Sequence, residues 1–130
     1  MADVNIIEYI TMATTGDSVD FGDLTTTRSQ TACGSNTTRG FITGDNGTSD
    51  SIDYITIATL GNAADFGDLT VTRASLSGAS NNTRGTINGG DDYPTKFDII
   101  EYITIATTGD ATDFGDLTRT KYTQCATSGD

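Results

Sequence analysis

Ile52-Asp53-Tyr54-Ile55-Thr56-Ile57-Ala58-Thr59 is the strongest indication of the fold in this sequence, because the chain contains three copies of it. The other two copies, with small changes, are Ile7–Thr14 and Ile100–Thr107. Each copy is followed by Asp-Phe-Gly-Asp-Leu-Thr, at residues 20–25, 65–70 and 113–118. The tyrosines of the three copies are spaced by 45 and then 48 residues. Repeats of this length are typical of propellers, solenoids and trefoils, in which each unit buries its apolar face against its neighbours.

The 130 residues are expected to form one domain of three repeats, about 1–48, 49–93 and 94–130, the last lacking its final strand. Long helices need Ala, Leu, Glu and Lys, which are scarce here beside Thr, Gly, Asp, Ser and Asn. Runs of Thr, Ile and Tyr broken by Gly, Asn and Asp predict short strands joined by turns. The sequence therefore predicts an all-β fold with about four strands in each repeat.

The charge balance is strongly acidic, with 18 acidic and 7 basic residues and a formal net charge of −11. This charge argues against binding nucleic acid or an anionic membrane through a basic patch. No apolar run approaches the roughly 20 residues that a membrane-spanning helix needs, and the first residues do not resemble a signal peptide. We therefore expect a protein made in the cytoplasm that has no nucleic-acid and no membrane partner.

The repeated Ile-Glu-Tyr-Ile-Thr segment is the strongest strand signal. Alternation places Ile7 and Tyr9 on one face of the strand and Ile6 and Ile10 on the other, so neither face is polar. Two largely apolar faces predict burial on both sides, as in stacked sheets. The Asp-Phe-Gly segment is expected to be a turn whose Phe fills the core. The predicted core and repeat interface consists of Ile7, Tyr9, Phe21, Ile52, Tyr54, Phe66, Ile100, Tyr102 and Phe114.

Basic residues recur at one position of the repeat, as Arg28, Arg73 and Lys121. Recurrence at a fixed position predicts structural ion pairs, and a row of ligand-binding cations is the alternative. The expected acidic partners, contributed by a neighbouring unit, are Asp23, Asp68 and Asp116. A second recurring position holds Arg39 and Arg84.

Two carboxylates flank each Phe of the Asp-Phe-Gly segments. Carboxylates and turn carbonyls together can bind Ca²⁺, which takes six to eight oxygen ligands. Asp at a turn also caps backbone amides by itself, and no EF-hand signature is present, so the turn interpretation is favoured and calcium is the alternative. The residues concerned are Asp20, Asp23, Asp65, Asp68, Asp113 and Asp116.

The usual signatures of catalysis are missing from the sequence. Histidine is absent, which removes the commonest general base and metal ligand. The sequence has no Gly-x-Ser-x-Gly elbow, P-loop or Cys-x-x-Cys pair. We therefore expect no enzyme activity, no catalytic residue and no cofactor. Cys33 and Cys125 lie at nearly equivalent repeat positions; reduced thiols are favoured, and pairing stays open.

The repeat resembles a degenerate kelch-type β-propeller blade. Gly89-Gly90 corresponds to the blade's diglycine, Tyr54 and Tyr102 to its tyrosine and Arg73 to its basic residue, while Phe66 stands where Trp is usual. Nearly the whole chain is similar to kelch-like repeat proteins encoded by tailed phages of aquatic bacteria. The segments that carry this similarity are 53–59, 65–70 and 82–85. The resemblance implies four-stranded, propeller-type blades and a role in the phage particle.

Three blades are too few for a closed propeller, and exposed edge strands require a partner. We expect neighbouring subunits to complete the blades, in a closed ring or a head-to-tail fibre. The competing fold is a monomeric β-trefoil or β-prism with internal threefold symmetry.

The expected function is that of a non-enzymatic, self-assembling virion structural or accessory protein: a capsid decoration, tail or fibre component. Its partners would be itself and other virion proteins, such as those of the capsid or tail. The alternative is a lectin-like module that binds host-surface glycan in up to three equivalent pockets. Loops that differ between the copies are the expected contact sites. They contain Asp45, Asn46, Asp91, Asp92 and Tyr93.

Overall fold

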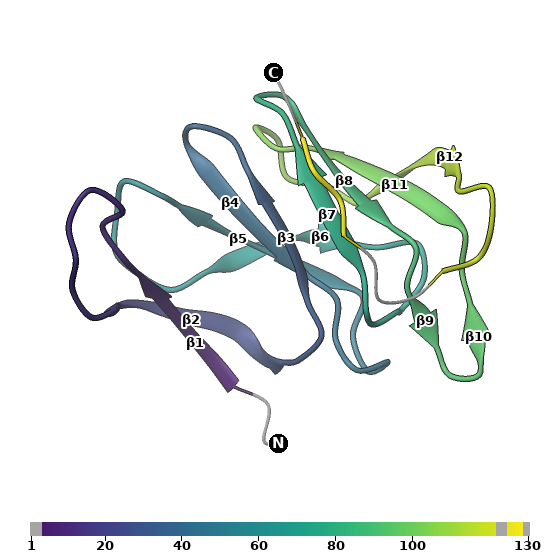
Figure 1. Ribbon diagram of the computed structural model, residues 1–130, viewed down its shortest axis with the longest axis horizontal. Helices are drawn as coiled ribbons and strands as arrows, with labels where there is room; N and C mark the ends of the chain where they lie inside the picture. Colours follow the sequence, from purple (N-terminus) through teal and green to yellow (C-terminus); the bar gives the residue numbers. More distant parts are fainter. Residues whose placement is uncertain (1–3, 122–124, 129–130) are drawn as a thin grey trace.

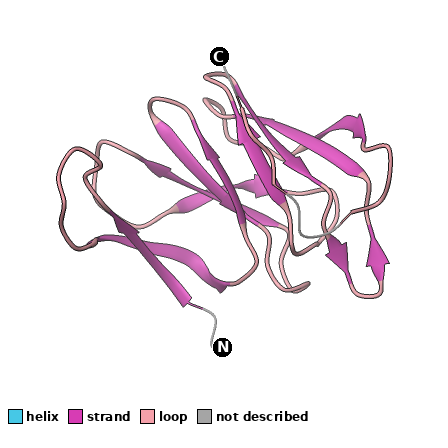
Figure 2. Ribbon diagram, viewed as in Figure 1, coloured by secondary structure: helices cyan, strands magenta, loops and turns pink. Residues whose placement is uncertain are grey.

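The computed structural model describes residues 4–121 and 125–128. These residues form strands and loops, as Figure 2 shows. The all-β prediction is therefore confirmed. The first sheet is two-stranded, with β1 (Val4–Tyr9) antiparallel to β2 (Val19–Arg28).

Two four-stranded antiparallel sheets follow along the chain. The strand order of one is β3 (Ala32–Ser35), β4 (Arg39–Thr43), β5 (Ser51–Thr56) and β6 (Ala64–Asp68). The order of the other is β7 (Ser77–Ser80), β8 (Arg84–Asn88), β11 (Ile99–Thr104) and β12 (Thr112–Asp116). In the chain, a small hairpin of β9 (Asp91–Asp92) and β10 (Thr95–Lys96) connects β8 to β11.

The sheets are out of phase with the sequence repeats. Each four-stranded sheet takes two strands from one repeat and two from the next, so that β3–β4 pair with β5–β6 and β7–β8 pair with β11–β12. The hairpin β1–β2 is the first-repeat counterpart of β5–β6 and β11–β12. Figure 1 shows the three sheets one after another along the long axis of the molecule. Consecutive repeats are therefore held together by strand pairing as well as by packing.

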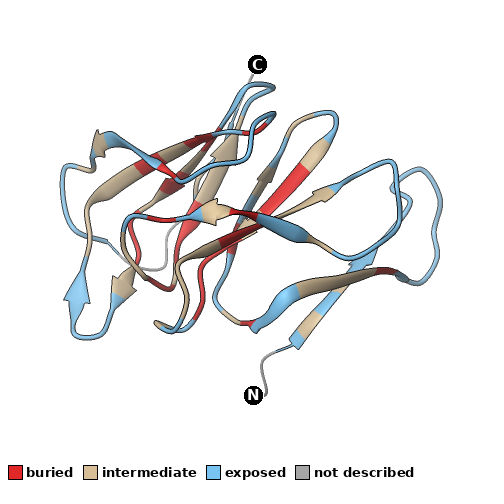
Figure 3. Ribbon diagram, turned by 180° about the vertical axis from the view of Figure 1, so that it is seen from behind, coloured by how far each residue is buried: buried red, intermediate tan, exposed pale blue. Residues whose placement is uncertain are grey.

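The main core lies in and between the two four-stranded sheets, where Figure 3 shows most of the buried segments. Phe41 of β4 is buried, and its ring lies against two glycines, one from each sheet. A Cβ atom would lie 2.6 Å from this ring at Gly34 and 2.3 Å from it at Gly85. Neither position has room for a side chain, because interiors are packed to crystal-like density. The other members of the buried cluster are Ala32, Ile52, Phe66, Leu69, Leu76, Ile87, Ile103, Ile105 and Ala111.

The Asp-Phe-Gly segments lie in strands β2, β6 and β12, which corrects the prediction that they are turns. Ile52 pairs with Gly67 and Asp53 pairs with Asp65, so Phe66 is an extra residue that opposes no partner. The other two hairpins show the same register shift. This β-bulge bends the strand and re-aims the aromatic side chain while pairing continues on both sides.

Burial of the repeated strand depends on its place in the molecule. Ile52 in β5 and Ile103 in β11 are buried, but in the first copy Ile10 and Met12 are 63% and 94% exposed. The prediction of burial on both faces is therefore wrong for β1. The reason is positional: β1 pairs with β2, and no described strand lies along its other edge. Among the described sheets none closes on itself, so the chain by itself forms an open row.

Candidate functional site

The repeats meet at two equivalent junctions, where the strand that contains Asp-Phe-Gly contacts the next copy of the repeat. At the first junction the amide of Gly61 donates to the Phe21 carbonyl (2.9 Å) and Ala63 donates to Asp23 (2.8 Å). At the second junction the same two bonds run from Gly109 to Phe66 (2.7 Å) and from Ala111 to Asp68 (2.8 Å). A junction is therefore a defined set of contacts that the chain makes twice.

A buried ion pair lies at the first junction. Arg28 Nη2 is 3.0 Å from Asp53 Oδ1, and both side chains are 0% exposed. Arg28 also donates to the carbonyl and the hydroxyl of Ser51, both at 2.7 Å. The amide and the hydroxyl of Thr25 donate to the Asp53 carboxylate. These bonds stabilise two charges that burial alone would make costly.

The second junction repeats this arrangement with Arg73 and Glu101, whose side chains are also 0% exposed. Thr70, the counterpart of Thr25, donates its amide to Glu101 Oε1 at 2.8 Å. Burial lowers the pKa of Arg73, and the charge and hydrogen bond of Glu101 act in the opposite direction. The Nε atoms of Arg73 and Arg28 have no hydrogen-bond partner among the described residues.

The acidic partners differ from those expected. Arg28 and Arg73 pair with Asp53 and Glu101, and not with Asp23 and Asp68. Asp68 as a whole residue is exposed. Partial desolvation of its carboxyl raises its pKa, and so do the nearby charges of Asp50, Asp110 and Asp65. The neighbouring charges that act on Asp68 are therefore acidic. The counterparts in the third copy, Lys121 and Asp116, are both exposed.

Sequence reasoning missed the true partners, although a signal was present. Glu8, Asp53 and Glu101 occupy one position in the middle of the apolar strand of all three copies. An acidic residue on an otherwise buried strand needs a cation or hydrogen-bond donors. The recurring arginines were the available cations.

The glycines of the first two bulges are required by the close approach of the next repeat. Gly67 has φ +147°, a conformation that side-chain-bearing residues rarely adopt. A Cβ atom there would lie 2.4 Å from the Gly109 carbonyl oxygen, and one at Gly22 would lie 2.4 Å from that of Gly61. At Gly115, in the third copy, a Cβ atom would meet no described atom within 4 Å. That face of the third repeat is open.

The recurring tyrosines each lie between a phenylalanine and, in two copies, an arginine. The Tyr54 and Phe66 rings pack edge to face with centroids 5.9 Å apart, and the Arg39 guanidinium lies 4.5 Å from the Tyr54 centroid. Tyr102 packs equally with Phe114 and Arg84, at 6.0 and 4.4 Å. Both kinds of contact are favourable. They explain why basic residues recur at the second position.

The residues predicted as core and interface are therefore not equivalent in the structure. Phe66 is 3% exposed and Phe21 is also buried, whereas Phe114 is 56% exposed. Tyr9 is 39% exposed, and Tyr54 is partly buried. The exposure of Phe114 differs from the expectation because no described repeat covers it. Ile52 is buried, and the remaining predicted members, Ile7, Ile100 and Tyr102, are half-buried.

Three equivalent hollows lie at the loops between the strands of β1–β2, β5–β6 and β11–β12. Their volumes are about 110, 270 and 350 Å³, in that order. Each is lined by the repeated tyrosine, threonines, a glycine and an Asp or Asn, which in the third copy are Tyr102, Thr104, Thr107, Thr112, Gly109 and Asp110. Such linings offer hydroxyl groups and either a carboxylate or a carboxamide group for polar ligands.

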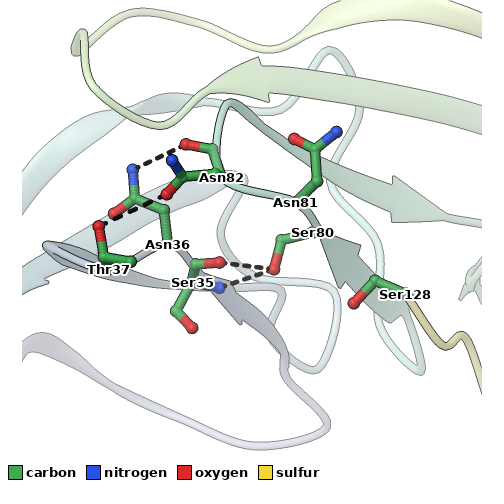
Figure 4. Close-up of a pocket in the computed structure, with 7 residues that line it drawn as sticks. All are labelled: Ser35, Asn36, Thr37, Ser80, Asn81, Asn82 and Ser128. Atoms are coloured by element: carbon green, nitrogen blue, oxygen red, sulfur yellow. Dashed lines mark hydrogen bonds between the residues drawn. The ribbon is translucent and has the colours of Figure 1, made fainter. Parts of the chain in front are cut away.

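A fourth hollow, of about 510 Å³, lies between the β3–β4 and β7–β8 turns, shown in Figure 4. The Ser80 hydroxyl bridges the two turns, accepting from the Ser35 amide (2.9 Å) and donating to the Ser35 carbonyl (2.8 Å). Asn36 donates to the Asn82 carbonyl at 3.3 Å. These side chains are uncharged and bonded to one another, so the hollow is a part of the contact between repeats. Its lining is Ser35, Asn36, Thr37, Ser80, Asn81, Asn82 and Ser128.

The expected contact loops are only partly exposed. Tyr93 is 91% exposed, and Asn46 and Asp92 are also exposed, while Asp91 is half-buried. Asp45 is 5% exposed, which corrects its assignment as a contact residue. Burial by itself would raise the pKa of Asp45, but hydrogen bonds from Thr48 and the Asn46 and Ser29 amides, with the Arg28 charge, lower it.

Neither a metal site nor a disulfide is assembled in the described part of the chain. No three His, Cys, Asp or Glu side chains gather there as metal ligands, so the calcium alternative has no ligand set among these residues. Cys33 and Cys125 are both unpaired and exposed.

No protein-family model matches this chain, and no curated protein matches it. Within residues 4–121 and 125–128, the structure has no helix of the length and apolarity that a membrane span requires.

Proposed function

We propose that this protein is a non-enzymatic, self-assembling structural or accessory component of a phage particle, as a capsid decoration or a tail or fibre part. Its blades are propeller-type units that neighbouring subunits complete. The observation that carries the proposal is the incomplete sheet β1–β2. Its counterparts β5–β6 and β11–β12 each belong to a four-stranded sheet, whereas β1 has no described partner beyond β2.

An unpaired strand edge is a template for pairing with another chain, and soluble proteins usually protect such edges with charge, proline or a covering loop. Glu8 is the one charged residue of β1, and large apolar side chains of this region face solvent. Val4, Ile6 and Val19 are each more than half exposed. Large exposed apolar surface of this kind marks an interaction site. The resemblance to phage-encoded kelch-like repeats supports the particle as the place of assembly.

The first test is the absolute mass of the purified protein by light scattering, with negative-stain images of the same sample. We expect defined multiples of 13.6 kDa, seen as rings or fibres. A protein that remains a 13.6 kDa monomer at every concentration would overturn self-assembly. Co-purification with virions would then test the location separately.

The three equivalent hollows favour a second candidate, a lectin-like module that binds host-surface glycan. Each hollow offers a tyrosine and several hydroxyl groups. An arginine already lies over the rings of Tyr54 and Tyr102, where it competes with a stacked sugar, so we rank this function second. A glycan array tests it, and the expected result is binding that is lost in Thr107→Ala and retained in Tyr93→Ala, which lies outside the hollows.

A further inference from the structure

We propose that the third repeat of one chain docks on the first repeat of a second copy and makes a third junction of the same kind, with Lys121 paired to Glu8 of that copy. The inference rests on the proposed self-assembly and names its interface. It follows from the two junctions within the chain, because the same contact groups are present, unused, on the two outer faces of the molecule.

The donating face belongs to the third repeat. Phe114 and Lys121 occupy the positions of Phe66 and Arg73, and the intervening residues Asp116 and Thr118 match Asp68 and Thr70. Phe114 is 56% exposed and Lys121 is exposed. Lys121 is held by its backbone, which donates to the Phe97 carbonyl (3.2 Å) and accepts from the Gly90 amide (2.9 Å). In the described chain, backbone hydrogen bonds therefore hold this face in place, and no other repeat covers it.

The receiving face belongs to the first repeat. Glu8, Gly16 and Asp17 occupy the positions at which Glu101, Gly109 and Asp110 contact the second repeat. All three residues of the first repeat are exposed. Ile10 and Met12 of the same repeat are also exposed. This face presents the carboxylate and the turn amide that a junction uses.

The two faces match in shape and in charge. At the second junction the Gly109 carbonyl lies so close to Gly67 that a Cβ atom on Gly67 would have no space. No described atom occupies the equivalent space beside Gly115. Gly16 of a second copy would fill that space. Lys121 and Glu8 have opposite charges, and their counterparts in the chain are buried ion pairs. A second copy therefore fits both faces, and head-to-tail contacts of this kind produce rings or filaments.

The decisive experiment is a charge exchange measured by sedimentation velocity over a range of protein concentrations. Lys121→Glu and Glu8→Lys each place like charges together, and we expect each to weaken association by roughly tenfold or more. The double variant Lys121→Glu/Glu8→Lys restores opposite charges, and should recover association. Both residues are exposed, so circular dichroism of every variant should match that of the wild type.

A second pair of variants tests the apolar part of the interface. Phe114→Ala should weaken association, whereas Tyr93→Ala, which removes an equally accessible aromatic side chain from the β9–β10 turn, should leave it unchanged. A wild-type protein that assembles equally well with Lys121→Glu, Glu8→Lys and Phe114→Ala would overturn this interface and leave self-assembly standing. Failure of the double variant to recover association would refute the ion pair. A wild type that never assembles would overturn both this interface and the proposed self-assembly.

Discussion

Replacing Phe66 by alanine should destabilise the protein far more than the same replacement at Phe114, although the two residues occupy one repeat position. Phe66 is 3% exposed, belongs to the buried cluster and packs on Tyr54. Removing a buried Phe side chain loses its transfer free energy and leaves a cavity, at a cost of roughly 3–5 kcal/mol. Phe114 is 56% exposed and no described repeat covers it, so less than half of its surface is buried. Its replacement by alanine should therefore cost only about 1 kcal/mol.

The assay is urea unfolding followed by far-ultraviolet circular dichroism, at a protein concentration low enough for the wild type to sediment as a monomer. The free energy of unfolding comes from the midpoint and the slope of each transition. A domain of this size is only marginally stable, with about 5–15 kcal/mol in total. Phe66→Leu therefore serves as a milder variant, at about 1–2 kcal/mol, in case the alanine variant does not fold.

Either of two results would contradict this prediction for Phe66 and Phe114. A loss below about 1 kcal/mol for Phe66→Ala would show that this side chain does not fill the core. Equal losses at Phe66 and Phe114 would show that the following repeat does not contribute to burial. Either result would leave the junctions without their assigned role.

Three further predictions concern the junctions and a loop. Glu101→Gln should destabilise by roughly 3–5 kcal/mol in urea unfolding, because it leaves the buried Arg73 charge uncompensated; an effect as small as that of a surface substitution would show that the pair is hydrated. Gly67→Ala should cost more than Gly115→Ala in thermal unfolding, since both strain a positive φ but only Gly67 also meets the next repeat; equal costs would contradict this. Asp45 has a pKa lowered below 3.8, so its carboxylate stabilises the fold above that pH and this contribution is lost as the pH falls through the folded-state pKa. Acid titration of Asp45→Asn should lack that loss, and an unchanged titration would exclude the role of Asp45.

Much of the fold is predictable because strand periodicity is local. The three copies, the turns between them and the strand composition of Thr, Ile and Tyr predict an all-β chain with about four strands per repeat. The first repeat has the four strands β1–β4, and the second has β5–β8 and the two-residue β9. The burial of Phe21 and Phe66 was also predictable, because a large aromatic residue recurs at one position within a largely polar segment.

The rest could not be predicted from a repeat taken alone, because it depends on what lies next to that repeat. Arg73 is paired with a residue 28 positions away in the chain, and sequence distance does not show which of several acidic residues the fold brings to it. Identical segments are buried in one copy and exposed in another, as Phe66 and Phe114 are. The repeating unit is visible in the sequence, because side-chain alternation and turn formation depend on neighbours within a few residues. Which faces meet and which remain open follows from the folded arrangement of the repeats, because burial depends on the surface that a neighbouring repeat covers.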